Sequence, residues 1–193
     1  ATIDFYTIPT QGNASDFGDL TLARGNGMAG FSSRTRGVSA GGFDPTANYK
    51  RIDFVTMSST GDATNFGSLT SNREGPMGLS DSTRGIVAAG WSRPNAANIR
   101  EIDYVSIAQA GNSEDFGDLV NGASAGFFTA SSRTRGIFAG SYSSPAQEGT
   151  NTIEFVTIAS QGNSVDFGAD MTTKHRSGHS ASSSTRGVFG GGF

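Results

Sequence analysis

The sequence contains no cysteine, which excludes a disulfide framework as well as zinc or iron–sulfur sites that need thiolate ligands. No uninterrupted apolar run approaches the roughly 20 residues that a membrane-spanning helix requires. Charge is also sparse: the 193 residues carry a formal net charge of −3, which provides no basic surface for nucleic acid or for an anionic membrane. We therefore expect neither a nucleic-acid partner nor a membrane partner.

Small residues are abundant instead, with 28 glycines and only 35% hydrophobic residues, and their order repeats. Three blocks recur four times in the same register. The first block is a β-branched and aromatic run at 3–8, 52–57, 102–107 and 153–158. The second is an Asp/Asn-Phe-Gly triplet at 16–18, 65–67, 115–117 and 166–168, and the third is a Thr-Arg-Gly triplet at 35–37, 83–85, 134–136 and 185–187. The first isoleucines, at 3, 52, 102 and 153, are 49, 50 and 51 residues apart, so the chain consists of four copies of one unit.

The composition of each block predicts strands. The first block has no glycine or proline inside it and is rich in β-branched and aromatic side chains, which is typical of a strand. The third block continues into a short apolar run that ends in small residues and an aromatic residue, as at Val38–Phe43, and predicts a second strand. Weaker strands are predicted over Phe17–Leu22 and Gly30–Arg34 and at the equivalent places. No window shows a sustained helical period, so the sequence predicts an all-β chain with about four strands per unit.

A repeat of this length with four strands is expected for one blade of a β-propeller. A lone sheet of small side chains buries little apolar surface, whereas sheets stacked face to face bury both faces. Within the chain, each glycine-ended strand is followed after a loop by a first-block strand. The first-block strand at 3–8 has no such strand before it, and the strand that ends at Phe193 has none after it. We therefore expect residues 1–193 to form a single four-bladed propeller, with units starting near 3, 52, 102 and 153, in which the N- and C-terminal strands pair and close the ring.

The units resemble the kelch repeat, in which a glycine doublet ends one strand. The doublet is present as Gly41-Gly42 and Gly191-Gly192, and it is weakened to Ala89-Gly90 and Gly140-Ser141. The segment Arg176–Ser180 is similar to the start of a kelch unit, and the phenylalanine of the second block stands where kelch repeats usually carry tryptophan. The resemblance implies a divergent, kelch-like propeller. The close repetition of the blocks also resembles repeat-rich structural and tail-associated proteins of tailed phages, particularly marine ones.

Charged residues recur at two fixed positions of the unit. They are the arginines Arg36, Arg84, Arg135 and Arg186 and the acids Asp4, Asp53, Asp103 and Glu154. One interpretation is a ring of ligand-binding charges around the propeller axis. Because a group present in every unit more often belongs to the scaffold, we expect each arginine to pair with a carboxylate and with backbone carbonyls, and so to tie strands or blades together. The second-block acids Asp16, Asp115 and Asp166 are competing partners.

The residues that differ between units lie in the predicted loops. These loops are 44–51, 92–100 and 143–152, together with 23–31, 72–79, 121–129 and 173–181. Binding residues commonly lie on such loops of a rigid scaffold. Trp91, Arg93 and Tyr142 are candidates for recognition because aromatic side chains and arginine dominate binding hot spots. For Trp91 we favour the alternative, in which the indole packs at the end of its strand.

Three further patterns are typical of other kinds of site. Gly25–Gly30 matches the G-x-G-x-x-G dinucleotide fingerprint, but no helix is predicted after it and the other units lack it. His175 and His179 have the four-residue spacing of metal ligands on a helix, yet on a strand they are about 13 Å apart. Asp16 and Asp19 match no dedicated calcium loop. We therefore expect no cofactor, no metal ion and no catalytic residue.

These observations favour a non-enzymatic structural or recognition module. The resemblance to phage proteins implies a virion component on a tail fibre or capsid surface. Its partner would be another virion protein, a cell-surface protein or a cell-surface glycan. The chain could also form an oligomer. The alternative is a free-standing bacterial lectin-like or protein-interaction propeller, which would be cytoplasmic. An enzyme of the galactose oxidase type has little support, because its copper site needs a cysteine-linked tyrosine and the chain has no cysteine.

Overall fold

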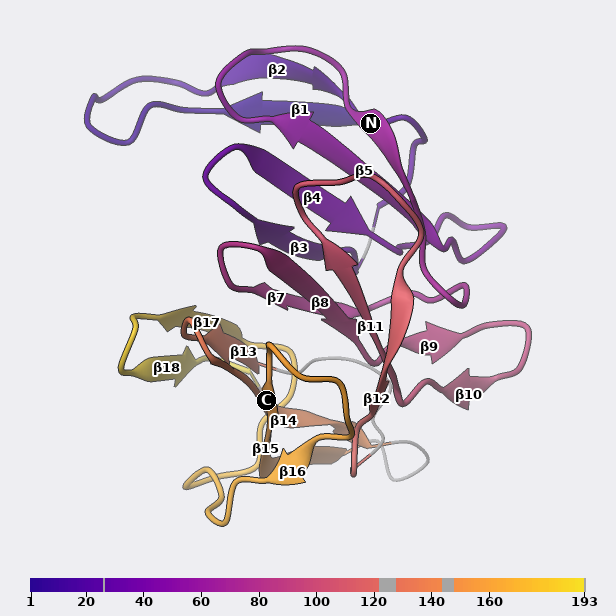
Figure 1. Ribbon diagram of the computed structural model, residues 1–193, viewed down its shortest axis with the longest axis vertical. Coiled ribbons are helices and arrows are strands. Elements are labelled where there is room, and N and C mark those ends of the chain that lie inside the picture. The colour runs from indigo at the N-terminus through magenta and orange to yellow at the C-terminus, as the bar shows by residue number, and fades with distance from the viewer. Residues whose placement is uncertain (26, 122–127, 144–147, 193) are drawn as a thin grey trace.

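A computed structural model describes residues 1–25, 27–121, 128–143 and 148–192 (Figure 1). In these residues all regular elements are strands, and every strand pair is antiparallel, which confirms the predicted all-β class. Parts of the predicted loops 121–129 and 143–152, together with residues 26 and 193, lie outside the described residues.

Three complete sheets each contain four strands. The first sheet has the order β3(Ala29–Ser32), β4(Arg36–Ala40), β5(Arg51–Thr56) and β6(Thr64–Ser68). The second has β7(Met77–Ser80), β8(Arg84–Ala88), β11(Glu101–Ser106) and β12(Glu114–Asp118), and the third has β13(Phe128–Ser131), β14(Arg135–Ser143), β15(Glu148–Thr157) and β16(Val165–Asp166). Each sheet thus takes the last two strands of one sequence unit and the first two of the next.

Three two-stranded hairpins complete the fold. The N-terminal hairpin consists of β1(Thr2–Phe5) and β2(Ser15–Asp19), and the C-terminal hairpin of β17(His179–Ser182) and β18(Gly187–Gly190). A small hairpin of β9(Trp91–Ser92) and β10(Ala97–Asn98) lies between β8 and β11 in the chain. By sequence register, the N-terminal hairpin corresponds to the outer half of a complete sheet and the C-terminal hairpin to the inner half.

The sheets are stacked as a fan, with their inner strands next to one another (Figure 1). Strand β3 lies against β7, β7 against β13, and β13 against β17. A serine at the same place in successive inner strands links them. Ser80 Oγ donates to the carbonyl of Ser32 at 3.0 Å, Ser131 Oγ to Ser80 at 2.9 Å, and Ser182 Oγ to Ser131 at 3.2 Å.

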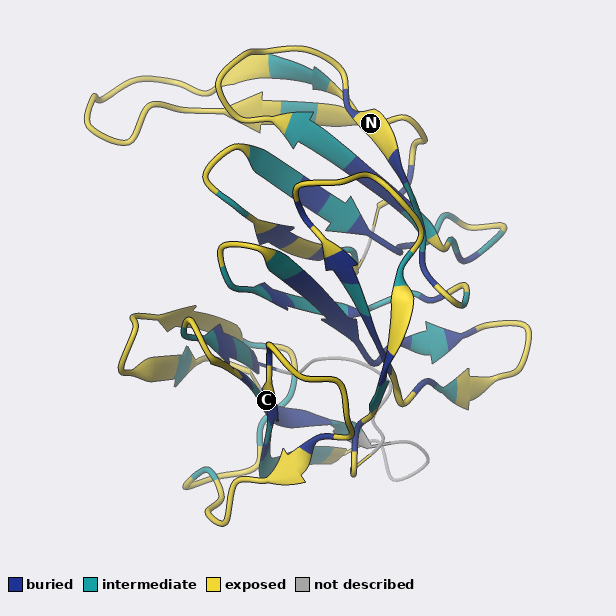
Figure 2. Cartoon of the chain, viewed as in Figure 1, coloured by how far each residue is buried: buried dark blue, intermediate teal, exposed yellow. Residues whose placement is uncertain are grey.

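The hydrophobic core lies between the sheets, in two clusters built from equivalent positions. The first cluster joins the first and second sheets through Phe31, Val38, Ile52, Phe66, Val87, Val105 and Ile107. The second joins the second and third sheets through Leu79, Ile86, Ile102, Phe116, Phe138, Val156 and Ile158. Figure 2 shows the consequence: buried residues concentrate in the middle of the stack, and the two terminal hairpins are largely exposed.

In the first and second sheets the Asp/Asn-Phe-Gly triplet forms a β-bulge that directs its phenylalanine into this core. Ile52 is opposite Gly67 and Asp53 is opposite Asn65, so Phe66 is the extra residue of the outer strand. Such a bulge turns one side chain away from the regular alternation of a strand. Phe66 is 3% exposed and meets the ring of Phe54 edge to face, with 5.8 Å between the ring centroids.

The predicted pairing of the N- and C-terminal strands is absent from the described residues, and this part of the fold prediction was wrong. Strand β1 pairs only with β2, and β18 pairs only with β17. Figure 1 shows the two hairpins at separate places in the stack. The stack does not turn back on itself, so the two halves of the fourth sheet do not meet.

Candidate recognition site

The recurring acids of the three complete sheets are buried. Asp53 and Asp103 are 0% exposed and Glu154 is 1% exposed. Each lies in the third strand of its sheet, where it faces the segment that follows the preceding outer strand. Asp4, at the same place in β1, is exposed.

Each buried carboxylate accepts hydrogen bonds from that neighbouring segment. Thr21 Oγ1 donates to Asp53 at 2.6 Å, and Thr70 donates to Asp103 through both its N–H and its Oγ1 at 2.8 Å. For Glu154 the donors are the backbone N–H groups of Val120 and Asn121, at 3.0 and 2.9 Å.

Because the donors and the acceptor belong to successive sheets, each acid locks one sheet to the next. All three are occupied by protein donors, so these carboxylates do not form the ring of ligand-binding charges that the sequence left open.

The arginines that pair with two of these acids are not the recurring ones. Arg24 Nη1 lies 2.8 Å from Asp53 Oδ2, and Arg73 Nη2 lies 3.2 Å from Asp103 Oδ1, with both arginine side chains 0% exposed. Burial lowers the pKa of Arg24, and the charge of Asp53 opposes that shift. An arginine nevertheless stays protonated, so the buried charges are matched.

Sequence reasoning missed Arg24 and Arg73, although a signal was present. Each stands three residues after the threonine that binds the same carboxylate, in the pattern Thr-x-x-Arg at 21–24 and 70–73. The same pattern occurs at 173–176. It is absent from the other unit, so the pattern occurs in three units of four.

The recurring arginines play only part of the role predicted for them. Arg36 Nη1 donates to the carbonyl of Ile107 at 2.8 Å, and Arg84 Nη1 donates to the carbonyl of Ile158 at 2.8 Å. Each guanidinium also stacks on an aromatic ring of its own sheet, at 4.5 Å from the centroid for Phe54 and 4.6 Å for Tyr104. The predicted tie between sheets through backbone carbonyls is therefore confirmed for these two.

The predicted carboxylate partners of these arginines are wrong. The recurring acids lie farther along their strands than Arg36 and Arg84 reach. The side chains of Arg24 and Arg73 reach two of them instead. Arg135 and Arg186 are exposed, and Arg135 stacks on Phe155 at 4.5 Å. In the part of the chain that the structure describes, neither guanidinium donates to a carbonyl of another sheet.

The recognition candidates lie on one edge of the stack, where the apolar strand of each unit ends in an aromatic residue. Phe43, Trp91 and Tyr142 occupy this place in three units and are each half-buried. Arginines cover two of them: Arg93 lies 4.2 Å above the ring of Phe43, and Arg176 lies 4.9 Å from the ring of Tyr142. We call these five residues the aromatic–arginine row.

Trp91 is held by its backbone rather than by deep packing of its ring. Its N–H donates to the carbonyl of Glu74 at 2.8 Å, and its carbonyl accepts from Asn48 Nδ2 at 2.8 Å. Arg93 Nε donates to Glu74 Oε2 at 2.6 Å while the Arg93 side chain remains 43% exposed. The row therefore combines fixed positions with accessible aromatic and cationic surface.

The loop beside Phe43 is organised by Asp44. Its Oδ1 accepts from the N–H and the hydroxyl of Thr46 at 2.7 and 2.6 Å, and its Oδ2 accepts from the hydroxyl of Tyr49 at 2.5 Å. The hydrogen bonds from Thr46 and Tyr49 hold the pKa of Asp44 well below its ordinary value of 3.8. The bond to Asp44 raises the pKa of Tyr49 above its ordinary 10.0.

Replacing Asp44 with asparagine is expected to lower the pKa of Tyr49 toward its ordinary value, because the anionic acceptor that stabilises the phenol is removed. A difference titration of tyrosinate absorbance between the wild type and Asp44→Asn measures this shift. The pKa of Tyr104, which is raised by its hydrogen bond to Glu114, should not change and is the internal control. An unchanged Tyr49 titration would contradict the assignment.

The same pair gives the loop a pH dependence. The pKa of Asp44 is lower in the folded protein than in the unfolded chain, so its contribution to stability is present above about pH 3.8. That contribution is lost as the pH falls below this value toward the depressed folded pKa. Asp44 is therefore ionised, and able to accept its hydrogen bonds from Thr46 and Tyr49, across neutral pH.

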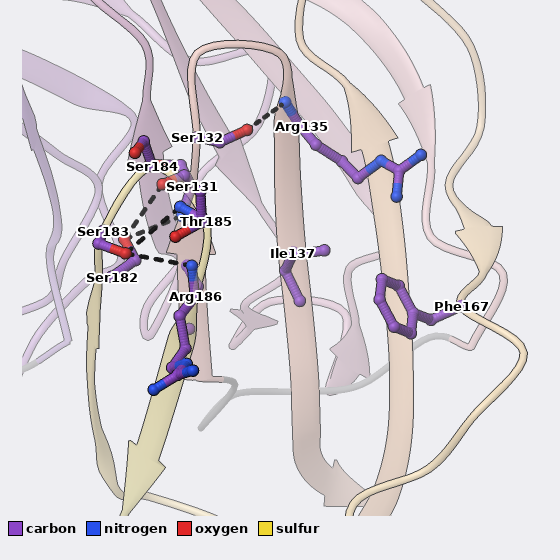
Figure 3. A pocket seen from close by; sticks show the side chains of 12 residues that line it. Ser131, Ser132, Arg135, Ile137, Phe167, Ser182, Ser183, Ser184, Thr185 and Arg186 are labelled. Atoms are coloured by element: carbon purple, nitrogen blue, oxygen red, sulfur yellow. Dashed lines mark hydrogen bonds between the residues drawn. The ribbon is translucent and has the colours of Figure 1, made fainter.

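A pocket opens between the third sheet and the C-terminal hairpin (Figure 3). Ala130, Ile137 and Phe167 line it from the sheet, and Ser182–Gly187 from the hairpin. Arg135 extends beside Ile137 toward Phe167 in this view. The lining combines apolar carbon with serine hydroxyls and two arginines, and it contains no carboxylate.

The histidines singled out by their spacing do not act together in the structure. His175 Nε2 is hydrogen-bonded to Thr173 Oγ1 at 2.5 Å, and the His175 ring meets Phe128 edge to face. His179 is exposed at the start of β17. Within residues 1–25, 27–121, 128–143 and 148–192, no group of three or more His, Cys, Asp or Glu side chains is placed to hold a metal ion.

Comparisons with known proteins leave the chain without an identified family. No protein-family model matches the sequence, and no curated protein matches it. Among the described residues, no helix is long and apolar enough to cross a membrane.

Proposed function

We propose that the chain is a non-catalytic recognition or structural module whose stacked sheets are kelch-like blades of the propeller type, which do not close into a ring within one chain. Three observations support this architecture. Each complete sheet has four strands in chain order, successive sheets are joined face to face by equivalent core residues, and the inner strands lie next to one another. Stacked sheets of this kind form a rigid support for loops.

One observation carries the functional proposal: residues that recur in the units hold the stack together, whereas residues whose identity differs between units lie along one edge of it. The recurring acids of the complete sheets and the core isoleucines are buried between sheets. Trp91, Arg93 and Tyr142 differ from unit to unit and lie on the aromatic–arginine row. Scaffolds that keep their interior regular and vary one edge are suited to binding.

The partner that we propose is another virion protein or a cell-surface glycan, with the module on a phage particle. Aromatic faces beside charged hydrogen-bonding groups suit both classes of partner, because rings stack on apolar faces and arginine donates in a fixed geometry. A free-standing bacterial lectin-like or protein-interaction module, which would be cytoplasmic, is the second candidate. The same row favours it, because nothing in the binding chemistry depends on a virion.

A glycan array tests the recognition role. We expect the wild-type chain to bind at least one class of glycan, and the double variant Trp91→Ala/Arg93→Ala to bind it about 30-fold more weakly, the loss expected for hot-spot truncation. Arg133→Ala removes an exposed arginine outside the row and is the matched control. Equal binding by the row variant and the wild type would contradict the site, and a silent array together with copurification in assembled virions would favour a structural role.

A further inference from the structure

In the described residues, β1 and β18 of the terminal hairpins have an unpaired edge on the side where their counterparts in the complete sheets pair with another strand. In the complete sheets, β4, β8 and β14 each pair with a strand on both sides. In the described residues β1 and β18 each pair on one side only. Unpaired edges present backbone donors and acceptors that a further strand can use.

The hairpins also expose apolar side chains at positions that are buried where two complete sheets face each other. Val188 in β18 is 59% exposed, whereas Val38 and Ile86 at the same position are 5% and 0% exposed. Ile8, just after β1, is 89% exposed, whereas its equivalents Ile107 and Ile158 are 1% and 0% exposed. The remaining equivalent, Met57, is preceded by the N-terminal hairpin rather than by a complete sheet and is 54% exposed. The exposed surface around Val188 and Ile8 is apolar because these repeat positions carry the side chains that are buried between two complete sheets.

Ile107 and Ile158 each insert into an apolar site on the preceding sheet. We call this site the seat. Ile107 belongs to the cluster of Phe31, Val38 and Phe66, and Ile158 belongs to the cluster of Leu79, Ile86 and Phe116. In both seats the recurring arginine of that sheet, Arg36 or Arg84, binds the carbonyl of the inserted isoleucine.

The third sheet carries the same seat without its isoleucine. The equivalent residues are Ala130, Ile137 and Phe167, and they line the pocket of Figure 3 together with Arg135. Arg135 stacks on Phe155 as Arg36 stacks on Phe54. The pocket is therefore shaped for a segment like Thr7-Ile8, with Arg135 placed to bind its carbonyl.

A second cavity lies at the other end of the stack, between the N-terminal hairpin and the first sheet. It is bordered by Ile3 and Leu20 on the hairpin side and by Gly30, Ser39 and Val55 on the sheet side. In the complete sheets this space is filled by the inner strand pair. The C-terminal hairpin is such a pair, so the two ends of the stack are complementary.

We propose that this chain associates with a second copy of itself by joining its C-terminal hairpin to the N-terminal hairpin of that copy. The two hairpins then form one four-stranded antiparallel sheet with the order β17, β18, β1 and β2. A chain's own hairpins lie at separate places in the stack (Figure 1), so the missing half of each terminal sheet comes from another chain.

The complete sheets set the register of this joint. Val38 is opposite Phe54, and Ile86 is opposite Tyr104, so Val188 is opposite Phe5 of the second copy. Asp4 then comes beside the segment before β17, where Arg176 stands in the pattern that places Arg24 on Asp53. The contact is head to tail, so it builds a closed ring or a filament rather than an isologous dimer.

Engineered cysteines test the joint, because the chain has none of its own. Opposed residues of paired strands lie within the Cα separation that a disulfide requires. We expect an oxidised mixture of Phe5→Cys and Val188→Cys chains to give a covalent heterodimer in high yield. Phe5→Cys mixed with Gly190→Cys, whose cysteine lies opposite Ile3 in this register, is the matched control and should give little.

A chain carrying both Phe5→Cys and Val188→Cys separates association from closure within one chain. Disulfide-linked multimers on a non-reducing gel support the proposal. A cross-linked monomer that migrates faster than the reduced chain would overturn it, because the hairpins would then meet in one molecule.

Sedimentation equilibrium provides an independent measurement. We expect the wild-type chain to associate with rising concentration, and Ile8→Asp to weaken that association about tenfold or more. Ile8 is 89% exposed in the single chain, so this substitution leaves the fold intact, which circular dichroism checks. A wild type that stays monomeric at all concentrations, or an Ile8→Asp variant that associates equally well, would overturn the proposal.

Discussion

Replacing Asp103 with alanine is expected to lower the free energy of unfolding by about 3–5 kcal/mol, the cost of leaving one partner of a buried ion pair without the other. Asp103 is 0% exposed and accepts hydrogen bonds from Arg73, Thr70 and Ser113, at distances between 2.8 and 3.2 Å. Its removal leaves the guanidinium of Arg73, also 0% exposed, with only the half-exposed carboxylate of Glu101, at 3.8 Å, as an ionic partner. Urea denaturation of the two proteins measures the difference.

The matched control for this substitution lies directly across the sheet. Asp115 is the antiparallel partner of Asp103 but is exposed, so Asp115→Ala is expected to change the free energy of unfolding by no more than about 0.5 kcal/mol. A double variant, Arg73→Met/Asp103→Leu, should be less damaged than Asp103→Ala, because no charge is left buried. Equal effects of Asp103→Ala and Asp115→Ala would show that the buried acid does not join the sheets.

Replacing Gly67 with alanine is expected to destabilise the protein by about 3 kcal/mol, at the upper end of the usual cost of overpacking. A methyl group at position 67 would lie 2.1 Å from the carbonyl oxygen of Gly111, which belongs to the turn of the next sheet. The obstacle is backbone, so the two sheets would have to separate to admit it. Thermal unfolding followed by circular dichroism measures the loss as a lower Tm.

The partner glycine of this contact provides the control. A methyl group at Gly111 would meet no atom within 4 Å, so Gly111→Ala is expected to change the stability by no more than about 0.5 kcal/mol. The two substitutions add the same methyl group on opposite sides of one contact. If both variants were equally stable, the close approach of the sheets at this point would be contradicted.

The strands were predictable because their signals are local. The β-branched first block became β5, β11 and β15, and the Arg-Gly block became β4, β8 and β14. The bulge at Phe66 was not predicted, because a one-residue slip between paired strands depends on the partner strand rather than on the triplet itself.

The recurring charges show where sequence reasoning failed. Their fixed positions correctly indicated a scaffold role, yet the pairing of Arg36 with a carboxylate was wrong. A repeat position specifies which residue type is needed and not what faces it across a neighbouring sheet. Arg24 reaches Asp53 from 29 residues away, a contact that exists only after the sheets stack.

By itself the sequence determined the unit: four copies of an all-β repeat with charges and aromatic residues at fixed places. It did so because strand formation and the alternation of buried and exposed side chains depend on neighbouring residues. Only the tertiary structure decided which arginine meets which acid, how closely the glycines of adjacent sheets approach, and that the two terminal hairpins remain apart. These outcomes depend on the angle and spacing between stacked sheets, which no single repeat specifies.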